Sequence, residues 1–166
     1  MTKRFQRITP FLWFDSQAEE AAKYYTSIFP DSGIDKILRY DEASSKGSGR
    51  PVGSVLTVDF RLDGSDMVAL NGGPHFKFNE AVSLVVNCKT QEEVEHYWKH
   101  LTEGGDPAAQ QCGWLKDKYG VSWQVVPVEL LDLLSDPDPV RAGKAMNSMM
   151  QMKKLDVNEV RRAMDA

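Results

Sequence analysis

The chain has 166 residues, of which 42% are hydrophobic and 27% charged, so we expect a folded protein with its own core rather than a disordered chain. Its formal net charge of −4 argues against a nucleic-acid or anionic-membrane binder, which normally carries a basic patch. No apolar run approaches the ~18 residues of a membrane span, and the first ten residues lack the apolar segment of a signal peptide. The two cysteines, Cys88 and Cys112, have no CxxC spacing, which favours a reducing cytoplasm.

The first half of the chain predicts one helix among several strands. Residues 8–14 form an apolar strand candidate. A helix follows with Ser16 as its N-cap, because Glu19 three positions later completes a capping box. Further strands are predicted at 34–40, 54–62 and 67–71, with a hairpin turn at 63–66. Residues 41–53 are rich in glycine, serine and charge, and this composition predicts a mobile loop.

The same pattern then starts again. A strand at 81–87 precedes a helix at 90–101, where Thr90 and Glu93 form a second capping box. The segment "EEAAKYYTSI" of the first helix aligns with "EEVEHYWKHL" of the second without a gap, so one constant offset relates the two helices. Short strands follow around "AQQCGWLKD" and "VSWQVVP", so the chain reads as βαβββ twice, at about 7–72 and 80–127.

After Pro127 only helical patterns occur, with Asp138 and Asp156 placed as helix N-caps. Residues 128–166 are therefore predicted to be a helical C-terminal extension of the domain at 1–127. Because its helices have one apolar face each, we expect the extension to pack on that domain or on a second subunit.

Two tandem βαβββ units resemble the vicinal oxygen chelate superfamily, which includes glyoxalase I, bleomycin-resistance proteins and extradiol dioxygenases. The segments that resemble its PhnB-like branch are "PFLWFDSQAEEAAKYYTSIFPDS", "LNGGPHFKFNEAVSLVVNC", "QCGWLKDKYGVSWQVVP" and the tail "LLSDPDP…MMQMKKLD", which span nearly the whole chain. The resemblance implies an α+β fold in which both modules form a curved mixed sheet around a cavity, with the helices outside.

Members of this branch often carry the name 3-demethylubiquinone-9 3-methyltransferase. A methyltransferase of the usual kind holds its cofactor with a glycine-rich turn between a strand and a helix. The only GxG in this chain, at Gly47 and Gly49, lies in the predicted loop with no helix after it. We therefore expect no Rossmann-type methyltransferase activity.

The resemblance also indicates where a metal would bind. Metal-using members take His, Gln or Glu ligands from the first strand and a late strand of each repeat, and Gln124 matches the last-strand ligand, which is usually Glu. The first strands offer only residues 8–10 and 82–83, the late strand of the first half offers residues 69–71, and none of these is a good ligand. A catalytic zinc or iron needs about three protein donors, so we expect no cofactor, and a divalent metal is disfavoured. Gln124 then either lines the cavity and hydrogen-bonds a polar ligand or water, or bonds a neighbouring side chain.

His75 is the best candidate for acid–base catalysis, because a histidine side chain can both donate and accept a proton near neutral pH. It follows two glycines and a proline, which would bring the backbone close to the cavity mouth, although a lone histidine in a loop is more often simply solvated. Asn71 could orient a substrate. Phe76 and Phe78 could wall a binding site or fill the gap between the two halves.

Other side chains suggest a lining for an anionic ligand. Trp13, Trp114 and Lys116 could supply aromatic and cationic groups, although large aromatic residues are as often part of a core. His96 and His100 have the helical spacing of a chelating pair. The apolar stripe of their helix turns both outward among glutamates, so a solvated polar face is the better interpretation.

The leading hypothesis is a PhnB-like protein that binds a small polar or anionic molecule in a cavity without a catalytic metal, as a homodimer. Bleomycin-resistance proteins bind without catalysis on this fold. The alternative is an enzyme that isomerises, cleaves, oxygenates or methylates a small oxygenated substrate, with His75, Asn71 and Gln124 at its centre. A third possibility is a structural or partner-binding role for the C-terminal extension.

Overall fold

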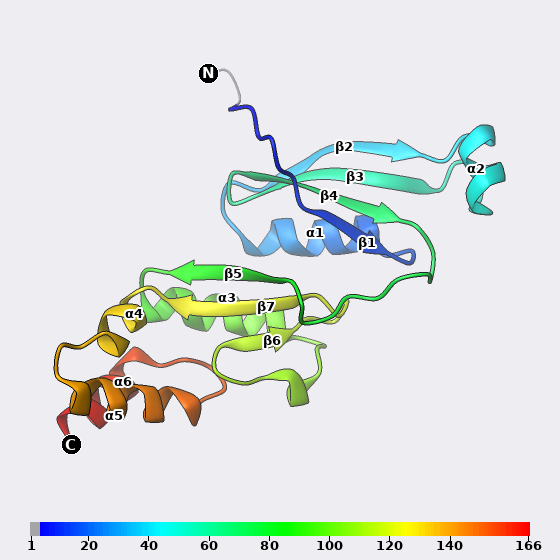
Figure 1. Ribbon diagram of the computed structural model, residues 1–166. Helices are drawn as coiled ribbons and strands as arrows, with labels where there is room; N and C mark the ends of the chain where they lie inside the picture. The colour runs from blue at the N-terminus through cyan, green and yellow to red at the C-terminus, as the bar shows by residue number, and fades with distance from the viewer. Residues whose placement is uncertain (1–3) are drawn as a thin grey trace. The chain divides into compact units, whose positions relative to one another are not determined.

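The computed structural model describes residues 4–166, which form two compact units that divide between Lys77 and Phe78. The first unit contains β1 (Phe11–Phe14), α1 (Ala18–Ile28), β2 (Gly33–Arg39), α2 (Glu42–Ser48), β3 (Val55–Leu62) and β4 (Ser65–Asn71) (Figure 1). The second unit contains β5 (Ser83–Cys88), α3 (Gln91–Thr102), the short 3₁₀ helix η1 (Pro107–Ala109), β6 (Trp114–Lys116), β7 (Ser122–Pro127), α4 (Glu129–Leu134), α5 (Pro139–Met150) and α6 (Val157–Asp165). The predicted α+β class is confirmed.

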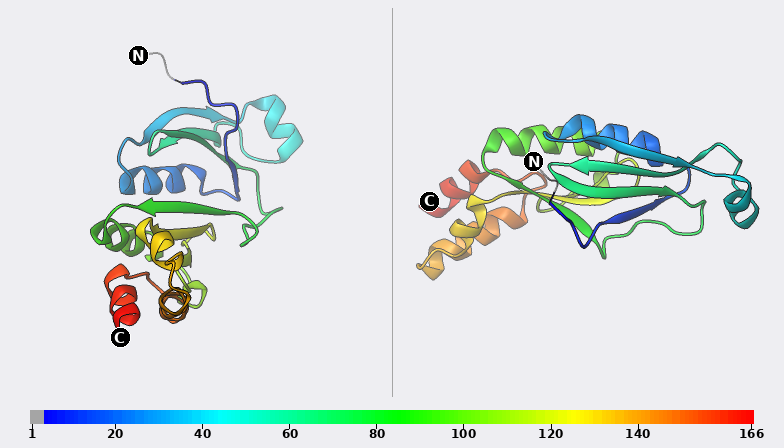
Figure 2. Two further views of the ribbon diagram at one scale, coloured as in Figure 1. Left: turned by 60° about the vertical axis from the view of Figure 1, so that its left-hand side comes forward. Right: turned by 90° about the horizontal axis from the view of Figure 1, so that it is seen from above.

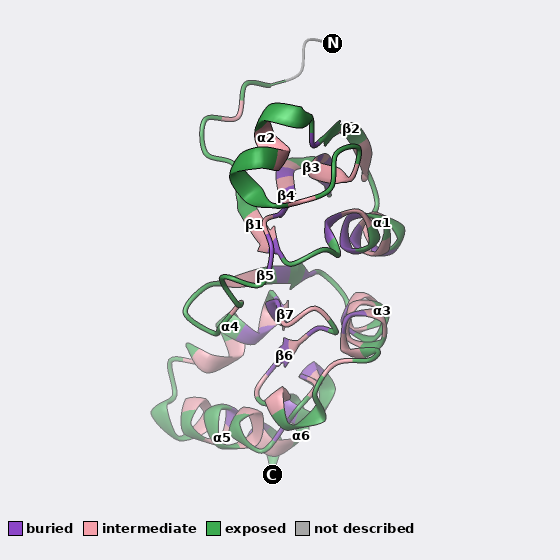
Figure 3. Ribbon diagram, turned by 90° about the vertical axis from the view of Figure 1, so that its right-hand side faces the viewer, coloured by how far each residue is buried: buried purple, intermediate pink, exposed green. Residues whose placement is uncertain are grey.

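The first unit is a four-stranded mixed sheet with α1 packed on one face. The strand order is β1-β4-β3-β2, in which only the β1–β4 pair is parallel. The buried side of α1 faces the strands of its own sheet (Figure 3), and the rings of Tyr25 and Phe60 stack there with centroids 6.4 Å apart. Burial of each such large side chain stabilises the fold by about 1.5–3 kcal/mol. The other face of this sheet is open and carries Trp13, opposite Leu70.

The N-terminus of α1 is capped by a residue from β4. The Ala18 N–H donates to Asn71 Oδ1 at 2.8 Å, while Gln17, at the N-cap position, makes no side-chain cap bond. The prediction of Ser16 as N-cap is therefore wrong. The physical reason is that β4 runs parallel to β1 and ends beside it, which brings Asn71 to the start of the helix.

The predicted loop at residues 41–53 contains the helix α2, which lies beyond the ends of β2 and β3 (Figure 2). Asp41 Oδ1 accepts from the Ser44 N–H at 2.8 Å, and Ser44 Oγ accepts from the Asp41 N–H at 3.0 Å. These bonds form a reciprocal capping box, and bonds from Ser44 also lower the pKa of Asp41. Gly49, with φ of 71°, ends the helix in the left-handed conformation that glycine allows. The loop prediction is therefore wrong for residues 42–48.

The second unit repeats this design with one strand fewer. Its sheet order is β5-β7-β6, with β5 and β7 parallel, and Thr90 caps α3 by accepting from the Glu93 N–H. The two helices keep the constant sequence offset predicted from their aligned segments. The same alignment pairs Ala18 with Gln91, and these are the first residues of α1 and α3.

The second copy has one strand fewer because the segment that joins its helix to its hairpin is shorter than in the first copy. In the first copy, β2 and α2 stand between α1 and the β3–β4 hairpin. In the second copy, only the short helix η1 stands between α3 and the β6–β7 hairpin. The second copy therefore has no counterpart of β2, and the second unit reads βαββ rather than βαβββ.

The C-terminal extension forms three helices in the same compact unit as β5–β7. α5 and α6 lie side by side (Figure 1) and share a small core with α4 that includes Leu130, Leu155 and Val160. Both predicted N-caps are confirmed, because Asp138 accepts from the Val140 N–H and Asp156 from the Glu159 N–H. Within residues 4–166, no helix has the length and apolar character needed to cross a membrane.

Candidate functional site

Three of the predicted site residues come together in the first unit. The indole of Trp13 lies on the backbone after β4, where its Nε1 donates to Gly73 O at 2.9 Å. A Cβ on Gly72 would come within 2.1 Å of the indole, so only glycine permits this approach. The Trp13 ring meets His75 and Phe76 edge to face, with centroids 6.5 Å and 4.9 Å away. His75 and Phe76 are exposed, so this cluster is an aromatic surface.

Asn71 is engaged elsewhere. Its side chain is buried on the α1 face of the sheet, where Oδ1 accepts from Ala18 and Nδ2 donates to Val55 O at 3.2 Å. Adjacent residues of a strand point to opposite faces, and Trp13 pairs with Leu70, so Asn71 points away from the Trp13 side. These contacts give Asn71 a structural task.

The other predicted lining residues, Trp114, Lys116 and Gln124, share one face of the second sheet. The register places Trp114 opposite Gln124, and Lys116 opposite Ser122, on the face that α3 leaves open. Gln124 Nε2 donates to Ser83 Oγ at 2.9 Å. Of the two alternatives for Gln124, the bond to a neighbouring side chain is therefore present, and the residue also lies on the open face.

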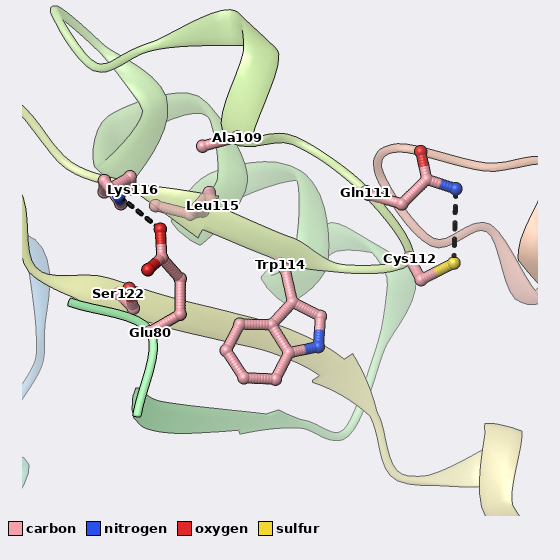
Figure 4. Close-up of a pocket in the computed structure, with 8 residues that line it drawn as sticks. All are labelled: Glu80, Ala109, Gln111, Cys112, Trp114, Leu115, Lys116 and Ser122. Atoms are coloured by element: carbon pink, nitrogen blue, oxygen red, sulfur yellow. Dashed lines mark hydrogen bonds and ion pairs between the residues drawn. The ribbon is translucent and has the colours of Figure 1, made fainter. Parts of the chain in front are cut away.

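A pocket of about 480 Å³ opens in this unit (Figure 4). Its size is typical of small-molecule sites. It is lined by Glu80, Ala109, Gln111, Cys112, Trp114, Leu115, Lys116 and Ser122. Trp114 and Lys116 were predicted from the sequence, whereas Glu80, Gln111 and Ser122 were missed.

The positive charge of Lys116 is balanced by an acidic partner. Its Nζ forms an ion pair with Glu80 Oε1, whose side chain reaches across from the segment before β5 (Figure 4). The hydrogen bond from Lys116 lowers the pKa of Glu80, so the carboxylate stays charged at neutral pH. The ion pair therefore leaves the pocket lining with no net charge.

Ser122 is the unusual polar group of the pocket. Its side chain is only 2% exposed, yet its Oγ has no hydrogen-bond partner within residues 4–166. An unpaired buried hydroxyl costs about 1–3 kcal/mol. A water or a ligand group that bonds Ser122 Oγ would remove this cost.

The remaining predicted residues lie outside the pocket. Phe78 is half-buried near the start of the second unit and does not line it. His96 and His100 lie with ring centroids 4.7 Å apart on α3, whose stripe of buried residues is formed by Val94 and Leu101. Across the described residues, no group of three or more His, Cys, Asp or Glu is placed to hold a metal ion.

The family model for 3-demethylubiquinone-9 3-methyltransferase matches residues 6–126. The chain belongs to this PhnB-like family. Among solved structures it is similar to the PhnB protein from Bacillus cereus, at 38% identity over 74% of this chain and 100% of that chain, with a TM-score of 0.63. Protein PA1353 from Pseudomonas aeruginosa is 19% identical over 73% of this chain and 96% of its own, with a TM-score of 0.55.

The fosfomycin resistance protein FosX from Listeria monocytogenes shares the fold at 13% identity, over 81% of this chain and 99% of its own, with a TM-score of 0.50. At this identity the likeness to FosX shows a shared fold alone. No curated protein matches the sequence. The whole C-terminal extension, residues 128–166, lies beyond the region matched by the family model, which ends at Val126.

The residues at the superfamily's metal positions do not fit a metal here. Gln124 lies three residues before the end of β7, and the residue three before the end of β4 is the apolar Val68. Gln124 is itself bonded to Ser83. Residues 4–166 also contain no Rossmann site that would support the methyltransferase name, because each sheet has only one parallel pair of strands and Gly47 lies inside α2.

Proposed function

We propose that this PhnB-like protein binds a small organic molecule in the pocket of its second unit, through apolar contacts and hydrogen bonds rather than through a protein-bound metal. The observation that carries the proposal is Ser122, a residue that lines this pocket and whose buried hydroxyl has no hydrogen-bond partner within residues 4–166. A polar atom in this state is expected to meet a ligand or an ordered water.

The other lining groups favour binding over catalysis. The titratable side chains of the pocket are Glu80 and Lys116, which pair with each other, and Cys112. His75, the candidate acid–base group, is not among the lining residues. Trp114 adds an indole, a large surface for an apolar ligand.

Mass spectrometry tests the proposal directly. Protein purified without added metal is measured under native and then under denaturing conditions, and the difference gives the bound mass and the subunit count. A homodimer that carries an organic adduct, and a Trp114→Ala variant that has lost the adduct, are the expected results. Trp98→Ala, on α3 outside the pocket, is the matched control.

Two results would contradict the proposal. One metal ion retained per chain would refute binding without a metal. Absence of any adduct, together with no binding of any compound in a fragment library by ligand-observed NMR, would refute the pocket.

A further inference from the structure

The geometry points to a ligand class: an uncharged, flat aromatic molecule with one hydroxyl, amide or carbonyl group, from which Glu80 excludes anionic analogues. This inference rests on the proposed function, because it specifies the ligand of the same pocket. Three observations carry it: the charge balance of the lining, the position of Trp114 relative to Ser122, and the unpaired Ser122 hydroxyl.

The charge balance argues against an anion. Lys116 is the only cation and Glu80 the only carboxylate among the lining residues, and they are bonded to each other. An anionic ligand that approached Lys116 would have to displace the Glu80 carboxylate, or else lie beside that carboxylate and share the single positive charge with it. Like charges in contact disfavour binding. The anionic ligand that Lys116 alone suggested is thus disfavoured by its partner.

The strand register sets the shape of the ligand. Lys116 lies directly opposite Ser122, and Trp114 is two residues along the same strand on the same face. At ~3.3 Å per residue, this spacing is roughly 7 Å. It suits one aromatic ring over Trp114 with a polar substituent beside Ser122. Leu115, Ala109 and Cys112 complete an otherwise apolar lining.

The Ser122 hydroxyl sets the polar group. A hydroxyl can donate one hydrogen bond and accept others, so one hydroxyl, amide or carbonyl on the ligand satisfies it. Its burial makes this contact discriminating, because a ligand without such a group leaves the hydroxyl unpaired.

A matched series of probes tests the inference: 2-naphthamide, 2-naphthoate and naphthalene, titrated at pH 7 by ligand-observed NMR or calorimetry. The full-length protein is expected to bind 2-naphthamide at least about tenfold more tightly than 2-naphthoate. Ser122→Ala is expected to weaken 2-naphthamide about tenfold and to leave naphthalene unchanged.

Glu80→Gln is the decisive variant, since it keeps the size of the side chain and frees the Lys116 charge. It is expected to raise the affinity for 2-naphthoate at least about tenfold while 2-naphthamide changes less than about twofold. Glu92→Gln removes a carboxylate from the same unit but outside this pocket, and is expected to alter neither probe.

The outcomes separate the two proposals. Preference of the unmodified protein for 2-naphthoate, or equal gains in Glu80→Gln and Glu92→Gln, would overturn the ligand class and leave small-molecule binding in place. Failure of all three probes to bind at millimolar concentration would also overturn the ligand class, while the mass-spectrometric adduct decides independently whether the pocket binds at all.

Discussion

Replacement of Asn71 by alanine separates a structural role for this residue from a ligand-binding one. The substitution removes the acceptor for the Ala18 N–H and the donor to Val55 O, both in a side chain that is 4% exposed. Loss of an N-cap costs about 1 kcal/mol, and loss of a second buried hydrogen bond costs about another 1 kcal/mol or slightly more. We therefore expect Asn71→Ala to lower the free energy of unfolding by about 2–3 kcal/mol.

Urea unfolding, followed by circular dichroism, measures the loss. With an m-value of about 2 kcal/mol/M, the midpoint of the first unit should fall by about 1 M or more. Hydrogen exchange should accelerate locally in the first turn of α1, which loses its cap. Asn87→Ala, an exposed asparagine in the second unit, is the control and should change stability by less than about 0.5 kcal/mol.

A loss below about 0.5 kcal/mol in Asn71→Ala, with unchanged exchange in α1, would refute the capping argument. If adduct binding then fell while stability held, Asn71 would return to the binding site that the sequence suggested for it.

Four further outcomes test other parts of the structure. Gly72→Ala should displace the Trp13 indole, which a Cβ would approach to 2.1 Å, and so shift tryptophan emission and cost about 1–3 kcal/mol of stability. A maleimide should label Cys112 but not Cys88 in the folded protein, because Cys88 is fully buried and burial, with a smaller effect of nearby negative charge, raises the pKa of its thiol to about 11. The pKa of the Cys88 thiol is higher in the folded protein than the ~8.5 of an unfolded thiol. The contribution of Cys88 to the free energy of unfolding is therefore present below pH ~8.5 and is lost as the pH rises toward 11. A Cys88→Ala variant that lost the same stability at alkaline pH would contradict this. Gly113→Ala should loosen the extension, measured as faster hydrogen exchange in α5 and α6, because its Cβ would come 2.8 Å from Leu155 Cδ1 at a φ of 83°.

Local signals predicted the helix starts well where the cap is close in sequence. Thr90 and Asp156 each cap a helix that begins at the next residue, and both were identified from spacing alone. The same rule chose Ser16 for α1 and was wrong, because the cap is Asn71 from a distant strand. A cap supplied by a residue far away in sequence depends on the sheet topology, and a capping-box pattern, which covers only four residues, cannot reveal it.

The helix α2 was missed although its signal was present. Asp41 and Ser44 have capping-box spacing, but the surrounding glycines and serines outweighed it in the composition. Glycine is costly inside a helix; here Gly47 is tolerated within a helix of only seven residues, and Gly49 serves its end.

The candidate site was predictable in its strands and not in its irregular segments. The sequence suggested Trp114, Lys116 and Gln124 as lining residues without assigning them to one face, and the strand register of the structure puts all three on the same face. Glu80 lies in the turn before β5, and no periodicity reveals that its carboxylate reaches Lys116. Ser122 was missed because an unpaired hydroxyl can be recognised only when every neighbour is known.

The missing strand of the second unit has a consequence for the solubility of fragments. β6 is the outer strand of its sheet, and an open strand edge presents unpaired amide and carbonyl groups that promote aggregation. Beside it, the Cys112 and Gly113 N–H groups donate to the carbonyls of Met152 and Lys153, so the extension occupies donors that would otherwise lie open. A fragment that stops at Val126, where the family match ends, would expose these donors together with the apolar surface under Leu155. We therefore expect recombinant fragments to need an end point after α6 if the second unit is to stay monodisperse.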